Sequence, residues 1–222
     1  LQDYPKDKCE LIIVNDYPLQ KLHYPHPQVT IYNLDETFSL IGEKENYAIE
    51  RCKGELIAVW DDDDVALPNH LNNVARHWKK DTNIIHWETG VFYNEPSITA
   101  ISGVGNSGIV YSKDVWERIG KSPLENAGGD MTLTNRIHAL GGKVDVKMPD
   151  SEASWFYMWG GRGYHQSGMG TDDGSRPDII KRHSAHVESQ RKAGKIPTGD
   201  IHLVPSWKQD YKQMLKDYVS SS

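Results

Sequence analysis

Residues 56–68, LIAVWDDDDVALP, carry an apolar run that leads directly into four consecutive aspartates, Asp61 to Asp64. The apolar run is predicted to be a strand. Carboxylates that follow a strand directly are expected at the C-terminal edge of its sheet, the usual ligand crevice of α/β folds. Carboxylates this close repel one another, so a positive charge is expected beside them, most simply a divalent cation. A cation held by few carboxylates keeps open positions, and the sequence therefore predicts a metal site that can bind a nucleotide diphosphate.

The acidic cluster also has a simpler interpretation. Asp64 lies just ahead of a helix predicted from Pro68 to about Lys80, so the aspartates could be a solvated loop or favourable charge at a helix N-terminus. A solvated loop rarely follows a five-residue apolar strand so abruptly, however. The metal role is therefore favoured.

The first two-thirds of the chain alternates short β-rich runs with helical patterns. This alternation is typical of an α/β fold with a mostly parallel sheet and crossover helices. Ser112 is predicted to cap the short helix that follows it. Strands are predicted over residues 10–14, 29–32, 56–60, 84–87, 109–111 and 144–148, and helices over residues 41–52, 113–119, 131–140, 177–193 and 207–219.

Composition excludes several classes of protein. The 222 residues fit one sizeable α/β domain with a small C-terminal appendage, and the net charge of −6 argues against a nucleic-acid surface. No apolar stretch approaches the roughly 20 residues that span a bilayer, and the N-terminus does not look like a signal peptide. Cys9 and Cys52 form no CxxC pair, which argues against a disulfide framework or a cysteine metal site. We expect a cytoplasmic protein without a transmembrane segment, with the membrane surface as a second location.

Four segments of the chain resemble the family 2 glycosyltransferases, whose fold is called GT-A. The second segment is the most specific, because its elements keep the spacing of the family pattern G … R-N … A-x-G-E … D-x-D-D … P. The resemblance covers roughly residues 1–170. The four segments are Leu1–Asp16, Gly42–Pro68, Gly129–Leu133 and Trp159–His165.

The resemblance implies a Rossmann-like central sheet, mostly parallel and flanked by helices. Residues 1–64 would form the nucleotide-binding half of a GT-A domain and residues 65–170 the acceptor half, followed by a helical extension over residues 171–222. The family's first strand and helix would precede Leu1, so the chain is expected to lack them. The chain also departs from the family at Asn15, where an aspartate is usual, and at Gly129, where a glutamate is usual.

The activity that the resemblance implies is transfer of a sugar from a nucleotide-diphosphate sugar to an acceptor hydroxyl, in glycan or polysaccharide synthesis. A UDP-sugar is the first candidate donor, and the acceptor would be a glycan or a lipid-linked sugar. The family pattern makes Asp63 the central ligand of Mn²⁺ or Mg²⁺, with Asp61 as the next candidate for the metal or the ribose. His165 would be the third ligand, since imidazole suits Mn²⁺. The chain has ten histidines, so a histidine without a metal role is the alternative there.

Asp130 is the candidate general base. A carboxylate within hydrogen-bond reach of the acceptor hydroxyl can remove its proton, typically accelerating the reaction by ~10²–10⁴-fold. Asp130 follows two glycines at a predicted helix start, so the alternative is an N-cap, where aspartate is a preferred residue. A single displacement assisted by this base would invert the anomeric centre.

The remaining candidates would contact the donor nucleotide. Asp16 ends the first predicted strand, and the matching family residue binds the base or ribose; a strand-end aspartate is also a common turn residue. The other candidates are charged or polar residues near the predicted diphosphate position, for which the alternative is ordinary surface. They are Lys44, Asn46, Asp61, Asp62 and Arg162.

Two other functions remain open from the sequence. A nucleotidyltransferase, or a retaining glycosyltransferase, also uses a D-x-D-like metal site, but neither predicts Asp130 at a helix start. A non-catalytic module that binds carbohydrate or Ca²⁺ on the same scaffold is the alternative outside the enzymes.

Overall fold

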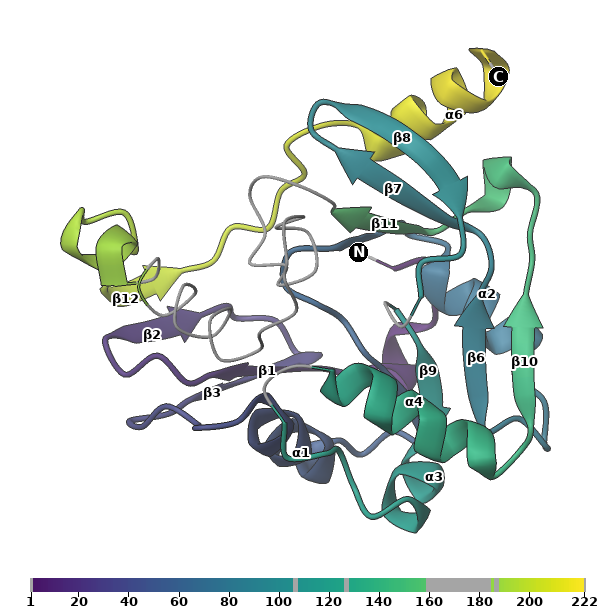
Figure 1. Ribbon diagram of the computed structural model, residues 1–222. Helices are drawn as coiled ribbons and strands as arrows, with labels where there is room; N and C mark the ends of the chain where they lie inside the picture. The colour runs from purple at the N-terminus through teal and green to yellow at the C-terminus, as the bar shows by residue number, and fades with distance from the viewer. Residues whose placement is uncertain (1, 106–107, 126–127, 159–184, 186–187, 222) are drawn as a thin grey trace.

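The computed structural model describes residues 2–105, 108–125, 128–158, 185 and 188–221. Figure 1 shows the helices and strands of this part of the chain. Two short 3₁₀ helices, Lys6–Lys8 and Asp150–Glu152, accompany them. The helices are α1 (Ile41–Arg51), α2 (His70–His77), α3 (Lys113–Arg118), α4 (Gly129–Ala139) and α6 (Tyr211–Ser221). The strands are β1 (Leu11–Asn15), β2 (Gln20–His23), β3 (Val29–Asn33), β4 (Leu56–Ala58), β5 (Val65–Ala66), β6 (Ile84–Trp87), β7 (Gly90–Asn94), β8 (Ser97–Ser102), β9 (Val110–Ser112), β10 (Lys143–Val146), β11 (Trp155–Met158) and β12 (Gly199–His202).

A four-stranded sheet with the order β10-β6-β9-β4 lies at the centre of the fold. β6 and β10 are parallel, and β9 runs antiparallel to both β6 and β4. Three of the four strands therefore run in one direction. Alternate side chains along a strand point to opposite faces, and both faces of this sheet are buried. This explains why the strands read as continuous apolar runs in the sequence.

One face of the central sheet is covered by α1, α3 and α4 (Figure 1). Ile84 of β6 and Tyr111 of β9 point to this face and pack with Trp116 of α3 and Ile137 of α4, all of them almost fully buried. The neighbouring residues in the same strands, Ile85 in β6 and Val110 in β9, point to the other face. There they pack with side chains from α2, β10 and β11.

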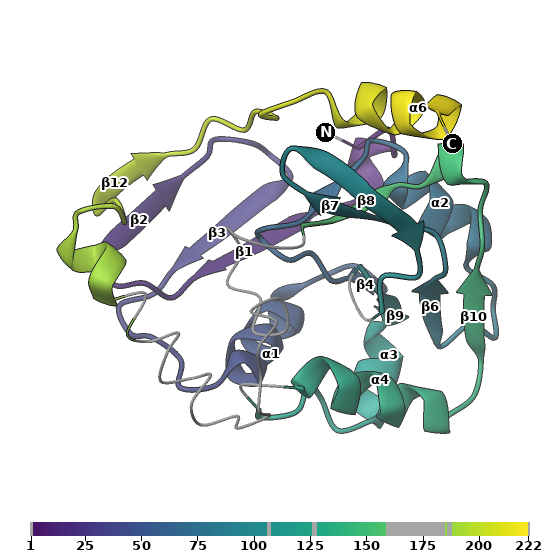
Figure 2. The same cartoon turned by 45° about the horizontal axis from the view of Figure 1, so that its top comes forward.

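A second sheet, β5-β11-β7-β8, stacks beside the first. β11 is parallel to β7 and antiparallel to β5, while β7 and β8 form an antiparallel hairpin. α6 covers this sheet, because Tyr211 and Leu215 pack on Tyr93 and Phe156 (Figure 2). Through its pairing with β5, β11 lies beside the segment that directly follows the aspartates.

Two parallel pairs complete the described fold. β1 pairs with β3, and α1 packs beside them through Tyr47, whose ring lies edge-on to Tyr32 at a centroid distance of 5.8 Å. β12 pairs with β2, which brings the C-terminal part of the chain beside the N-terminal part (Figures 1 and 2). The described part of the predicted C-terminal extension therefore packs against strands of both predicted halves.

Most predicted elements are confirmed within one or two residues, but several details differ. The strand predicted over residues 56–60 ends at Ala58, and the helix predicted from Pro68 to about Lys80 is shorter, His70–His77. The helix predicted over residues 207–219 begins four residues later, at Tyr211. The hairpin β7–β8 and strands β2, β5, β11 and β12 were not predicted. The helix predicted over residues 177–193 lies mostly outside the described residues. Within the described ranges, no helix is long and apolar enough to cross a membrane.

The packing of α4 on the central sheet gives a test of this core. Replacing the fully buried Ile137 by alanine should lower the free energy of unfolding by about 2–5 kcal/mol, because the substitution leaves a cavity. The matched control is Leu140→Ala, at a position 38% exposed just after the same helix, and its effect should be well below that of Ile137→Ala. Urea denaturation followed by circular dichroism measures both. Equal losses would mean that α4 does not pack as described.

Candidate functional site

The four aspartates form a tight turn between β4 and β5. Val59 still donates its N–H to the carbonyl of Ile109 at 3.1 Å, which extends the strand pairing one residue beyond β4. The turn closes with a hydrogen bond of 3.3 Å from the N–H of Asp64 to the carbonyl of Asp61. Asp61 and Asp62 are exposed, Asp63 is half-buried and Asp64 is buried. We call residues 61–64 the acidic turn; it stands at the C-terminal end of β4, as predicted.

Asp64 anchors the acidic turn to β11. Its Oδ2 accepts a hydrogen bond from the indole of Trp155, and its Oδ1 accepts one from the N–H of Met158, both at 2.9 Å. Burial, with a smaller effect of the charges of Asp61 and Asp63, raises the pKa of Asp64 to about 7. The two donors oppose this rise. Sequence reasoning gave Asp64 no role of its own, because both of its donors lie far away along the chain.

Aromatic side chains pack around Trp60, the residue that precedes the acidic turn. The ring of Trp60 lies 5.7 Å from that of Trp155 and 6.0 Å from that of His70. His70 is fully buried, and its Nδ1 lies 3.1 Å from the hydroxyl of Ser154. Burial lowers the pKa of His70 to about 4, so this imidazole is neutral near pH 7. His70 therefore belongs to the support of the turn, where a neutral ring packs without adding charge.

Glu45 of α1 is a half-buried carboxylate with a shifted pKa. Burial raises the pKa of Glu45, the Ser122 hydroxyl lowers it, and the charges of both Asp61 and Asp130 raise it. Glu45 was missed as a candidate. Its position three residues after Gly42 and four before Ile49 places it on the same helix face as both, which is the signal that could have identified it.

Asp130 lies in the first turn of α4 and is exposed. The N-cap position belongs to Gly128, whose φ of 73° is in the left-handed region that glycine adopts readily. The alternative prediction for Asp130, an N-cap, is therefore wrong. Asp130 is the second residue of the helix.

Asp16 and Lys44 form an ion pair at the end of β1. The Nζ of Lys44 lies 2.9 Å from Oδ1 of Asp16, and Oδ2 of Asp16 accepts the N–H of Phe38 at 3.2 Å. The Asp16 side chain is 15% exposed and that of Lys44 is 40% exposed. The structure thus brings together two of the predicted nucleotide-binding residues. Contact of either residue with a nucleotide stays a prediction.

Asn46 faces α3 and the segment after it. Its Oδ1 accepts hydrogen bonds from the N–H of Ser122 at 2.8 Å and from the indole of Trp116 at 3.1 Å. Its Nδ2 donates to the carbonyl of Ser122 at 3.1 Å. The amide is thus largely committed within the protein. The nucleotide contact predicted for Asn46 stays a prediction, beside this observed structural role.

Two of the three predicted metal ligands, Asp61 and Asp63, lie among the described residues. The described residues contain no group of three histidine, cysteine, aspartate or glutamate side chains placed to hold a metal ion. His165, the predicted third ligand, and Arg162 lie outside the described residues. Asp61 and Asp63 remain as a pair of hard oxygen donors in one turn. Two carboxylates fit Mg²⁺ or Mn²⁺, which keep several waters and also bind substrate phosphates.

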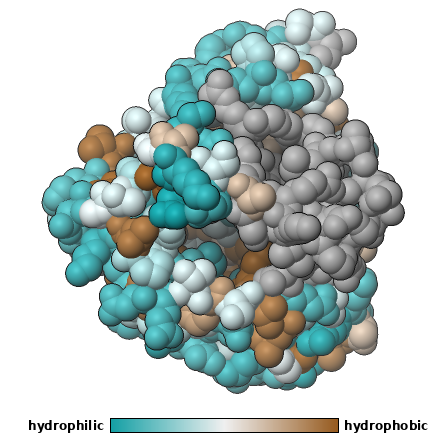
Figure 3. Space-filling model, turned by 60° about the vertical axis from the view of Figure 1, so that its left-hand side comes forward, coloured by the Kyte–Doolittle hydropathy of each residue, from teal (hydrophilic) through white to brown (hydrophobic). Residues whose placement is uncertain are grey.

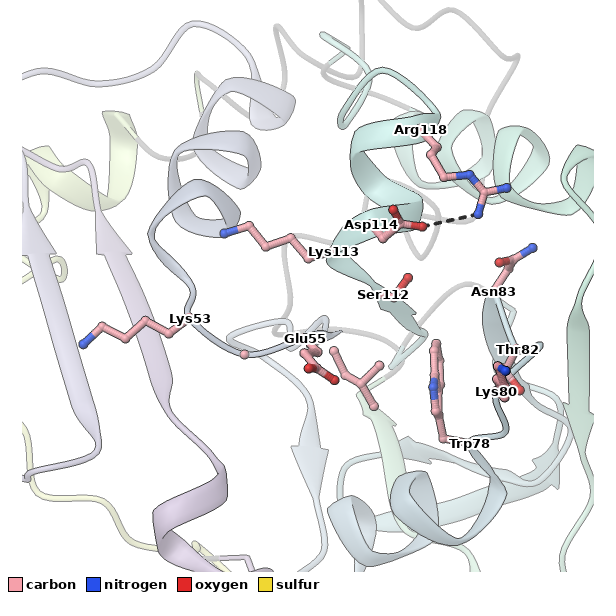
Figure 4. A pocket seen from close by; sticks show the side chains of 12 residues that line it. Lys53, Glu55, Trp78, Lys80, Thr82, Asn83, Ser112, Lys113, Asp114 and Arg118 are labelled. Carbon is pink, nitrogen blue, oxygen red and sulfur yellow. Dashed lines mark hydrogen bonds and ion pairs between the residues drawn. The ribbon is translucent and has the colours of Figure 1, made fainter.

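A hollow of about 460 Å³ lies at the other end of the central sheet (Figure 4). Leu56, the first residue of β4, lines it beside Trp78, whereas the acidic turn follows the last residue of that strand. Lys113 points away from Trp78 in Figure 4, and its Nζ donates to the carbonyl of Cys52 at 2.7 Å. Arg118 pairs with Asp114. None of the predicted site residues that the structure describes lines this hollow.

The surface on the side shown in Figure 3 is mostly hydrophilic over its described part. Hydrophobic residues there are scattered among hydrophilic ones rather than gathered in one patch. Single exposed apolar residues are normal on a protein surface and need no partner to explain them.

Comparison with known proteins agrees with this architecture. Residues 1–138, more than half of the chain, match the family model described as glycosyl transferase family 2. No curated protein matches the chain. Among solved structures, the chain is similar to TarS of S. aureus: the complex of TarS residues 1–349 with UDP-GlcNAc gives a TM-score of 0.60 at 13% identity, covering 84% of this chain. The complex with UDP gives 0.56 at 13% identity, covering 87% of this chain and 67% of that one.

The similarity to TarS concerns the fold. The chain spans 59% of the TarS chain in the UDP-GlcNAc complex and 35% of a longer TarS chain. The mixed α/β arrangement of the described strands and helices is similar to the GT-A fold of TarS.

The bonds of Asp64 give a test of how the acidic turn is held. Asp64→Asn replaces one acceptor oxygen by an NH₂ group that faces an N–H donor. The free energy of unfolding should fall by about 1–3 kcal/mol, the cost of a buried donor without its acceptor. Asp62→Asn, in the same turn but exposed, is the matched control and should change stability by less than about 0.5 kcal/mol. Equal stability of Asp64→Asn and the parent chain, in urea denaturation, would contradict the anchoring role.

Proposed function

The chain belongs to glycosyl transferase family 2, and we propose that it transfers a sugar from a nucleotide-diphosphate sugar to an acceptor hydroxyl, with a divalent metal and with inversion at the anomeric carbon. The observation that carries this proposal is the acidic turn after β4, which the two bonds of Asp64 to β11 hold in place. A glycosyl transfer needs charge stabilisation at the leaving group and a base at the acceptor. The acidic turn would serve the first need, and Asp130 in the first turn of α4 would serve the second.

The donor nucleotide is proposed to lie at the C-terminal ends of β1 and β4. Asp16 follows β1 and the acidic turn follows β4, so each stands at the C-terminal end of its strand, the end at which α/β folds bind ligands. Lys44 holds Asp16 through their ion pair. Asp16 would accept hydrogen bonds from the base or ribose, and Asp62 and Arg162 would contact the donor beside it.

Asp61 and Asp63 are the proposed metal ligands, with His165 as a third. When bound, Mn²⁺ or Mg²⁺ would offset the negative charge on the departing nucleoside diphosphate. The anchored Asp64 helps here, because its bonds to β11 fix the backbone of the turn that carries both ligands. Glu45 adds negative charge beside Asp61, which further favours a cation at this place.

Asp130 is the proposed general base. It is exposed at the start of α4, where an acceptor hydroxyl can reach it. The carboxylate would take the hydroxyl proton as the new glycosidic bond forms and the bond to the nucleoside diphosphate breaks. A single displacement of this kind inverts the anomeric centre.

A UDP-sugar is the proposed donor class, supported by the TarS structures, which are complexes with UDP-GlcNAc and UDP. A glycan or a lipid-linked sugar is the proposed acceptor class. The donor can be tested without knowledge of the acceptor, because water can take the place of the acceptor hydroxyl in a donor-hydrolysis assay.

Nucleotide and metal binding can be tested by thermal shift with UDP, GDP and dTDP, each with and without Mn²⁺. One nucleotide should raise the melting temperature in the presence of Mn²⁺, because a ligand at 100 times its Kd stabilises the native state by about 2.7 kcal/mol. Asp63→Ala should abolish the part of the shift that depends on Mn²⁺. Asp81→Ala, an exposed aspartate ahead of β6, is the control and should keep it.

Two results would contradict the metal assignment. An unchanged Mn²⁺-dependent shift in Asp63→Ala would remove this residue from the metal. Stabilisation by Ca²⁺ alone, with no effect of any nucleotide, would favour the non-catalytic binding module instead.

The base can be tested by release of UDP from a UDP-sugar. Asp130→Asn should lower kcat by ~10² or more and leave the Kd for UDP unchanged, because the amide cannot take a proton. Asp150→Asn, an exposed aspartate in the 3₁₀ helix ahead of β11, serves as the control. Turnover equal to that of the parent chain would rule out Asp130 as the base, and a product with retained anomeric configuration would rule out the single displacement.

A further inference from the structure

One face of α1 is directed at the segment that precedes α4. Gly42, Glu45, Asn46 and Ile49 are spaced by three or four residues and therefore share a helix face. Gly42 and Ile49 are buried, and Glu45 and Asn46 are half-buried. Opposite them lies the segment Ser122–Glu125, which we call the approach segment because the chain passes through it to reach α4.

Asn46 both accepts a hydrogen bond from the main chain of the approach segment and donates one to it. It accepts the N–H of Ser122 at 2.8 Å and donates to the carbonyl of the same residue at 3.1 Å. A side-chain amide that bonds both main-chain groups of one residue fixes the position and the orientation of that residue. The third bond of Asn46, from the indole of Trp116, holds the amide itself in place.

Gly42 allows the helix to approach this closely. A Cβ at this position would lie 1.9 Å from the carbonyl oxygen of Pro123 and 3.3 Å from the Cα of Leu124. Both are backbone atoms, which cannot turn aside as a flexible side chain can. The absence of a side chain at Gly42 is thus a condition for the bonds between Asn46 and Ser122.

The approach segment in turn holds the start of α4. Gly129, the first residue of α4, lies so near that its Cβ position is 3.7 Å from the Cβ of Glu125 and 3.9 Å from the carbonyl oxygen of Pro123. The hydroxyl of Thr132 donates to the carboxylate of Glu125 at 3.3 Å. The carbonyl of Pro123 therefore has α1 on one side and the first turn of α4, with Asp130, on the other.

We propose that Asn46 and Gly42 are positioning residues for the reaction, which set the place of the base Asp130 by clasping the approach segment. This inference rests on the proposed function, because it assigns Asp130 as the base. It gives Asn46 a role different from contact with the nucleotide. Lys44, two residues earlier, points instead to Asp16 and the donor side.

Kinetics of UDP release from UDP-GlcNAc separate the two roles. Asn46→Ala should lower kcat by ~10–10²-fold, since a small misplacement of a reacting group has effects of this size. The Kd for UDP, measured by titration, should stay within about twofold of the parent value, because a lost positioning contact lowers kcat rather than ground-state binding. Hydrogen exchange at the Ser122 amide should accelerate at the same time, because this N–H loses its acceptor.

Glu50→Ala is the matched control. It removes an exposed side chain of the same helix, whose partner is Lys121, but keeps the bonds between Asn46 and Ser122, so kcat should remain close to that of the parent chain. Asn46→Gln is a second variant if Asn46→Ala does not fold. It keeps the amide but moves it by one methylene group, and its kcat should fall between those of Asn46→Ala and the parent.

A double-mutant cycle with Asp130→Asn decides between the interpretations. If Asn46 acts through Asp130, the double variant should be no slower than Asp130→Asn alone. A raised Kd for UDP with kcat intact in Asn46→Ala would make Asn46 a nucleotide contact and overturn the inference, while the proposed function would stand. Unchanged turnover in Asp130→Asn would overturn the assignment of the base, and with it the inference.

Discussion

The concentration of negative charge at one place is the constraint on which the site depends. Asp61, Asp63, Asp64, Glu45 and Asp130 come from three separate parts of the chain, and the charges of the exposed members raise the pKa of the buried ones. Carboxylates gathered in this way destabilise the folded state unless hydrogen-bond donors or cations offset them. The described structure offers neutral donors to the two most buried members: Trp155 and the N–H of Met158 to Asp64, and the Ser122 hydroxyl to Glu45. These donors fix the carboxylates in place but do not cancel their charge. A site built in this way keeps a negative potential for a cation.

The surrounding packing is neutral for the same reason. His70 lies under Trp60 and beside Trp155, with a pKa lowered to about 4 by burial. A charged imidazole at this buried position would be costly to desolvate, which is why the ring is neutral. The neutral ring supports the turn by packing and through its contact with Ser154.

Sequence reasoning predicted the elements that depend on local pattern. The strand at Ile84–Trp87, the helix after Ser112 and the helix over Ile41–Arg51 follow from apolar runs, caps and turn residues within a few positions. It failed where the deciding partner is distant. The two bonds of Asp64 come from residues 91 and 94 positions away, and the bonds between Asn46 and Ser122 span 76 positions. The antiparallel hairpin β7–β8 was missed as well, together with β11, which pairs with β7 from a distant part of the chain. The family pattern identified which residues matter but could not tell the side to which each of them points.

That last difference has a structural consequence for α1. Successive residues of a helix are about 100° apart, so Lys44 and Asn46 point to nearly opposite sides. Lys44 reaches Asp16 at the end of β1, and Asn46 reaches Ser122 ahead of α4. One rigid helix thus carries a contact to the proposed donor side and a contact to the proposed acceptor side, only two residues apart. Any rotation of α1 about its axis would move both contacts together, whereas two separate loops could move independently. Under the proposed function, this one helix would therefore largely set the distance between a bound donor and Asp130, and Gly42 is what lets it lie so closely against the approach segment.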